Sequence, residues 1–157
     1  MFPTSYNRRF PAIGYTLRDE NWLVVADEPS VNAVEVVIEA GESRPKVKRY
    51  VGDATFAYLS LRTQRLTLGG RGATPQGDLE LLVELCQANQ AAAVSHQLTL
   101  PIDRVADVCR QVERLQEQLG ERSFFLGYTA GPDAGDPSLN DFQEVVESTQ
   151  CGLTLDL

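Results

Sequence analysis

The apolar residues of this chain change their spacing near residue 73, and that change constrains the fold more than any other feature. Before it, apolar side chains recur at every second residue, as in residues 56–62 (FAYLSLR), which is the period of a β-strand. After it, they recur at every third or fourth residue, which is the period of an amphipathic helix. The sequence therefore predicts a strand-rich first half, followed by a second half in which helices alternate with strands.

Strands are predicted in the first half at residues 22–26, 33–39, 47–51, 56–62 and 65–68. The segments between them are short and rich in Gly, Pro, Asp and Ser, which are typical of turns. Because such short loops cannot contain a parallel crossover, they predict an antiparallel meander. Within residues 56–62, Leu59 and Leu61 share one face while Ser60 and Arg62 share the other. One side of this sheet is therefore expected to meet water or a partner.

Amphipathic helices are predicted over residues 75–93 and 101–119, and a third from Ser138 through Val146, with strands at 94–100, at 123–129 and at the C-terminus. Their boundary signals are Thr74 and Pro75 for the first helix, Pro101 and Gly120 for the second, and Ser138 with Asp141, resembling a capping box, for the third. Residues 94–129 form a β-α-β unit, with a right-handed crossover expected if its strands are parallel. The predicted fold class is α+β, an antiparallel β meander followed by α-β-α-β-α-β with the helices packed on the sheet.

Residues 1–15 have neither helical nor clean strand periodicity and are predicted to form an extended N-terminal arm, with residues 16–157 as a single α+β domain. The arm contains the aromatic residues Phe2, Tyr6, Phe10 and Tyr15, together with Arg8 and Arg9, and no acidic residue. These aromatic side chains are expected to pack either on the domain's own core or on a neighbouring molecule.

Charge is segregated along the chain, whose net charge is −8. Residues 41–72 contain 7 basic and 2 acidic residues, whereas residues 73–157 contain 4 basic and 14 acidic residues. Such blocks are often only solvated faces. They also permit the basic surface of one copy to contact the acidic surface of the next, a head-to-tail contact that builds rings or tubes.

The same composition argues against several classes of protein. A net charge of −8 disfavours nucleic acid or an anionic membrane as the main partner. No apolar run approaches the length of about 20 residues that a membrane span needs, and the first residues do not resemble a signal peptide. We expect a protein of the cytoplasm, or one incorporated into a particle assembled in the cytosol.

Cysteine and histidine are too few for the common metal sites. The cysteines Cys86, Cys109 and Cys151 are far apart and are interpreted as reduced thiols, the first two on apolar helix faces. His96 is the only histidine, which excludes any site that needs two histidines. Since it shares strand parity with Val94 and Leu98, it is predicted to be a hydrogen-bonded histidine of the core or its rim. No metal, cofactor or catalytic residue is assigned.

The leading functional interpretation is a non-catalytic protein that binds other proteins, as a repeated subunit of a larger assembly such as a virion or a tail-like structure. The alternative is a stand-alone acidic inhibitor or immunity-type protein that blocks a basic partner. A small enzyme that pairs a cysteine with His96 is the third possibility. The residues predicted to contact a protein partner are aromatic or basic: Phe2, Tyr6, Arg8, Arg9, Phe10, Trp22, Lys48, Arg49, Arg62 and Arg65.

Overall fold

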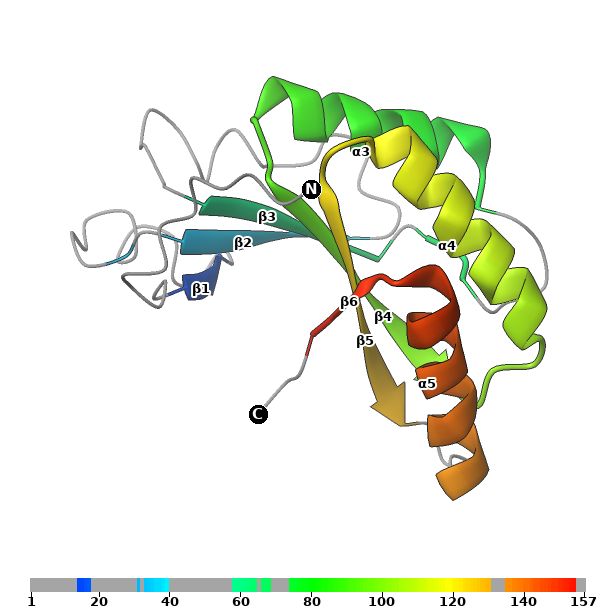
Figure 1. Ribbon diagram of the computed structural model, residues 1–157. Helices are drawn as coiled ribbons and strands as arrows, with labels where there is room; N and C mark the ends of the chain where they lie inside the picture. The colour runs from blue at the N-terminus through cyan, green and yellow to red at the C-terminus, as the bar shows by residue number, and fades with distance from the viewer. Residues whose placement is uncertain are drawn as a thin grey trace.

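A parallel sheet of six strands organises the part of the protein that the computed structural model describes (Figure 1). The structure describes residues 14–17, 31, 33–39, 58–64, 66–68, 74–130 and 135–154. Its strands are β1 (Gly14–Leu17), β2 (Ala33–Ile38), β3 (Tyr58–Thr63), β4 (Ala93–Leu100), β5 (Ser123–Ala130) and β6 (Gly152–Leu153). They lie side by side in chain order, and each strand is parallel to the next.

The predicted antiparallel meander is therefore wrong, and the fold is of the α/β type. Residues 18–32 separate β1 from β2, and residues 39–57 separate β2 from β3. Each connection exceeds the dozen or so residues that a parallel crossover needs. The prediction divided each of these connections into shorter loops, because it placed strands within them at 22–26 and 47–51. Both of these segments lie outside the described residues. Of the strand predicted at 65–68, residues 66–68 are described and form no strand.

The second half of the chain follows the predicted alternation of helices and strands. Helix α3 (Gln76–Ala88) precedes β4, α4 (Val105–Leu119) joins β4 to β5, and α5 (Asp136–Thr149) joins β5 to β6. The β-α-β unit is confirmed, with β4 and β5 parallel over eight residue pairs. Gly120 ends α4 with a φ of 66°, the left-handed conformation for which glycine is favoured.

The helix starts differ from the prediction by a few residues. Pro75 lies just before α3, and Thr74 does not cap that helix; its hydroxyl accepts a hydrogen bond from the Thr67 N–H at 2.8 Å. Ser138 is already inside α5, where its hydroxyl accepts a hydrogen bond from the Gly135 N–H at 3.5 Å. The prediction placed this capping residue too late, because Asp136 and Pro137 begin the helix before its apolar stripe does.

The described helices form one layer on one face of the sheet (Figure 1). Helix α4 packs between α3 and α5, with the Arg114 guanidinium donating to the Gln76 side-chain oxygen at 3.1 Å. On the other side of α4, the Gln116 amide donates to the Thr149 carbonyl oxygen at 3.3 Å. Right-handed crossovers that add each strand on the same edge leave all their helices on one face, which explains this arrangement.

The hydrophobic core lies between that helix layer and the sheet. Strands contribute Leu61, Leu98 and Leu126, while α4 contributes Val112 and Leu115, and none of these side chains is more than 1% exposed. The ring centroids of Tyr128 on β5 and Phe142 on α5 are 5.1 Å apart, so the two aromatic side chains join the sheet to the last helix. The face of β3 that contains Leu59 and Leu61 is buried, as the sequence alternation predicts.

Candidate functional site

A row of polar side chains crosses the sheet on the face opposite the helices. Thr16, Glu35, Arg62 and Ser95 come from β1, β2, β3 and β4, and the strand register places them on this face. The Arg62 Nε lies 2.9 Å from the Glu35 Oε2. Thr16 donates to the same oxygen at 3.2 Å, and Ser95 donates to Oε1 at 2.8 Å. Glu35 is thus held by groups from three other strands of the sheet.

This row explains why β3 has the residue pattern of a half-buried strand, although it lies in a parallel sheet. Parallel strands usually consist of continuous apolar residues, because helices cover both faces. Here the second face contains an ion pair whose Glu35 and Arg62 side chains are only 18% and 20% exposed. Strand β3 therefore alternates between apolar and polar residues, although it is parallel to its neighbours.

An open cleft of about 680 Å³ lies at the carboxyl ends of β3, β4 and β5. The cleft is lined by the end of β3 and the segment after it, by the second half of β4, and by one residue of β5. The lining residues are Arg62, Thr63, Gln64, Leu66, Thr67, Leu68, His96, Gln97, Thr99, Pro101 and Thr129.

His96 is a buried histidine on the rim of this cleft, which confirms its predicted environment. Its Nδ1 lies 2.8 Å from the carbonyl oxygen of Thr63 on the adjacent strand. A carbonyl oxygen only accepts, so Nδ1 holds the proton and the Nε2 of the neutral ring is an acceptor. Burial lowers the pKa of His96 below 6.5, opposed by the hydrogen bond to Thr63. The imidazole is therefore neutral at pH 7.

Lowering the pH should destabilise the fold through His96. Well above pH 6.5 the ring is neutral in both states and contributes no pH dependence. Below that value the unfolded chain takes up the proton first, so the free energy of unfolding falls until the pH also passes the lower pKa of the folded state. Urea unfolding followed by circular dichroism between pH 7.5 and about 5.5 measures this slope.

His96→Asn is the matched variant for this measurement, since its amide nitrogen occupies the place of Nδ1 and still donates to Thr63. We expect the variant to lose most of the slope above pH 5.5, where carboxylates contribute little. An unchanged slope in His96→Asn would show that another group causes it.

The cysteines give no support to a cysteine nucleophile. Cys86 is fully buried, and desolvation raises the pKa of its thiol to about 11, against a smaller opposing effect of Arg122. Burial also raises the pKa of Cys109 and of Cys151. A nucleophilic cysteine needs the opposite shift, because the thiolate is the reactive form. Among the described residues, no group of three or more His, Cys, Asp or Glu side chains could hold a metal ion.

Only one of the predicted partner-binding residues can be placed. Arg62 lies on the polar face, as predicted, where it joins the Glu35 ion pair and the wall of the cleft. The other nine lie outside the described residues: Phe2, Tyr6, Arg8, Arg9, Phe10, Trp22, Lys48, Arg49 and Arg65. Sequence analysis missed Glu35, although an acid within the apolar run AVEVVI was a usable signal.

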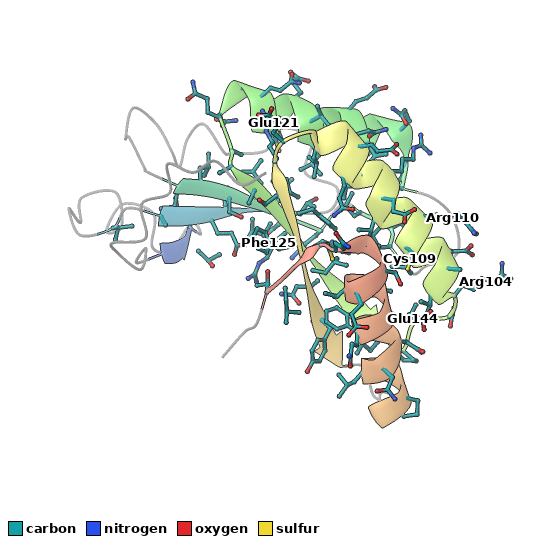
Figure 2. The ribbon with its side chains drawn as sticks, in the orientation of Figure 1. Arg104, Cys109, Arg110, Glu121, Phe125 and Glu144 are labelled. Carbon is teal, nitrogen blue, oxygen red and sulfur yellow. The ribbon has the colours of Figure 1, made fainter. Side chains whose placement is uncertain are left out.

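The outer surface of the helix layer is mainly acidic. Each helix contributes two exposed glutamates: Glu80 and Glu84 of α3, Glu113 and Glu117 of α4, and Glu144 and Glu147 of α5. Among the described residues, the exposed basic side chains are Arg104, Arg110 and Arg114, on or just before α4, and Arg104 and Arg110 project outward (Figure 2). These two are paired with Asp107, which partly neutralises them. Helix α5 contains no basic residue at all.

No protein-family model matches this chain, and no curated protein matches it significantly. In the part of the chain that the structure describes, none of the helices has the length and apolar character needed to cross a membrane. Functional interpretation therefore depends on the helix surface and the cleft themselves.

Proposed function

We propose that the protein acts by binding other proteins, as a repeated subunit of a larger assembly such as a virion or a tail-like structure. The acidic outer surface of the helix layer supports this proposal most. The described helices all lie on one face of the sheet, so their exposed acidic residues form one broad surface rather than being spread around the molecule. A surface of one sign favours and orients a partner of the opposite sign.

An exposed apolar spot lies at the end of this surface, beside α5. Leu139 is 43% exposed and Tyr128 is 39% exposed. Leu139 precedes Phe142 by one helical turn, and the Phe142 ring contacts that of Tyr128. Apolar and aromatic anchors surrounded by charged side chains are typical of protein interfaces, in which the anchors provide most of the affinity.

The partner surface that fits best is a second copy of the chain. Residues 41–72 contain 7 basic and 2 acidic residues, the opposite balance to that of the helices. A contact between this segment of one copy and the helix layer of the next joins different surfaces, so it repeats into a ring, tube or filament. Such a subunit would be found in the cytoplasm or in a particle assembled there.

Self-association should depend on salt and on the charge of α5. We expect light scattering on a sizing column to show an oligomer at low salt that dissociates as the ionic strength rises. Glu144→Lys should raise the protein concentration at which the oligomer half-dissociates by about tenfold, which corresponds to about 1.4 kcal/mol.

Glu39→Lys is the matched control for that variant. It changes the net charge equally at an exposed position just after β2, outside the helix layer. Equal effects of the two variants would mean that net charge, and not the helix layer, governs association. A monomer of 17.3 kDa at every salt concentration would contradict self-assembly. It would favour the alternative proposal, an acidic inhibitor or immunity-type protein whose helix surface blocks a basic partner.

A further inference from the structure

The cleft at the carboxyl edge of the sheet is separate from the helix surface and has the dimensions of a small-molecule site. Its volume of about 680 Å³ lies within the range of about 300–1,000 Å³ that is typical of such sites. Its walls come from three adjacent strands and from the segment after β3. Hydrogen bonding fixes these strands relative to one another, so the polar groups on them are positioned before any ligand arrives.

The lining is polar and rich in groups that hydrogen-bond to a hydroxylated compound. Thr67, Thr99 and Thr129 are exposed on its walls, and Gln97 adds a side-chain amide. A threonine hydroxyl both donates and accepts, and a carboxamide has both kinds of group. Such a surface matches the alternating donors and acceptors of a polyhydroxylated molecule better than it matches an apolar one.

Arg62 is the one charged residue among those that line the cleft in the described part of the chain. Its ion pair with Glu35 restrains the guanidinium, and Glu35 itself is not part of the lining. Of the two charged residues of this ion pair, Arg62 therefore lines the cleft and Glu35 does not. A planar guanidinium held in this way is suited to a carboxylate or a phosphate group.

His96 also borders the cleft, but from the other face of the sheet: Arg62 is opposite Ser95 in the register, so the side chain of the next residue, His96, points to the helix face. Because its Nδ1 donates to the Thr63 carbonyl oxygen, its Nε2 is left as an acceptor. Gln97, Thr99 and Thr129 share the face of Arg62 instead, so their side chains supply the contacts for hydroxyls. One ligand satisfies both these side chains and Arg62 if it has a hydroxyl as well as an anionic group.

We propose that this cleft binds a small hydroxylated organic anion, with its anionic group at Arg62 and its hydroxyls among Gln97 and the threonines of the wall. The ligand is either a sugar phosphate or a sugar acid, which share this chemistry. Binding at this edge leaves the helix surface open, so the ligand site is compatible with the proposed assembly and independent of it.

The test is a nitrogen–proton NMR titration of the full chain with glucose 6-phosphate, gluconate and glucose. We expect one or both anions to shift the amide signals of Gln97, Thr99 and Thr129 at millimolar concentration, and glucose to bind at least about tenfold more weakly. Stronger binding of glucose 6-phosphate identifies a phosphate ester as the preferred group, and stronger binding of gluconate identifies a carboxylate.

Two variants and a control locate the site. Thr99→Val removes one exposed hydroxyl with little change of shape and should weaken anion binding about threefold. Thr154→Val makes the same change outside the cleft and should have no effect. Arg62→Met should weaken binding by more than tenfold where it folds. The proposal is overturned if neither anion shifts these signals, if glucose binds as well as the anions do, or if Thr99→Val and Thr154→Val behave alike.

Discussion

Replacing Leu126 by alanine should lower the free energy of unfolding by about 3 to 4 kcal/mol. Leu126 is fully buried in β5, with His96 of β4 beside it on one side and Leu153 of β6 on the other. Strands on both sides and helices above hold the surrounding atoms in place, so the site cannot collapse around the smaller side chain. The cost is the lost transfer free energy together with that of the cavity. Urea unfolding followed by circular dichroism measures it.

Leu153→Ala is the control, because it deletes the same atoms on the adjacent strand. The Leu153 side chain is 48% exposed, so we expect a loss of less than about 1 kcal/mol. If the two variants lost similar stability, Leu126 would not be in the closed core that the sheet and the helix layer form. A loss in Leu126→Ala much above the expected range would indicate that β6 also detaches, since Thr154 donates to the Leu126 carbonyl oxygen at 2.8 Å.

The sequence predicts the second half of this fold because the signals there are local. The apolar stripe of α4 and the glycine that ends the helix lie within one segment, and helical period alone identifies them. The direction of the first strands is not a local property. It depends on the path of the residues that connect the strands. The alternation of apolar and polar residues in β3 is compatible with both parallel and antiparallel pairing. The half-buried pair of Glu35 and Arg62 produced that alternation in a parallel sheet.

The candidate cleft could not be predicted for a related reason. Arg62 and His96 both stand out in the sequence, the first as a partner-binding candidate and the second as the single histidine. They are far apart in the chain, and the parallel register of β3 and β4, in which Arg62 is opposite Ser95, brings them to one edge. An antiparallel meander would have placed the carboxyl ends of neighbouring strands at opposite edges of the sheet. The site could therefore not be recognised from the predicted topology.

Glu35→Gln should lower the free energy of unfolding by about 2 kcal/mol. The change keeps the shape of the side chain and an oxygen for Ser95, but it leaves the Arg62 guanidinium without its counter-charge in a setting that is only one-fifth exposed. Loss of one partner costs about 3 to 5 kcal/mol in a fully buried pair and up to about 1 kcal/mol on the surface, and this pair lies between those limits. Urea unfolding at pH 7 measures the loss.

A double-mutant cycle with Arg62→Met separates the ion pair from the rest of the polar row. We expect the two single variants to be coupled by about 1.5 kcal/mol, so that Glu35→Gln with Arg62→Met is less damaging than the sum of the two changes. Coupling below about 0.5 kcal/mol would mean that water screens the pair as it does on an ordinary surface. In that case Glu35 would not hold the guanidinium in place. Coupling of the expected size means that the sheet itself fixes the charged group at the wall of the cleft, because Glu35 and Arg62 come from strands whose register sets their separation.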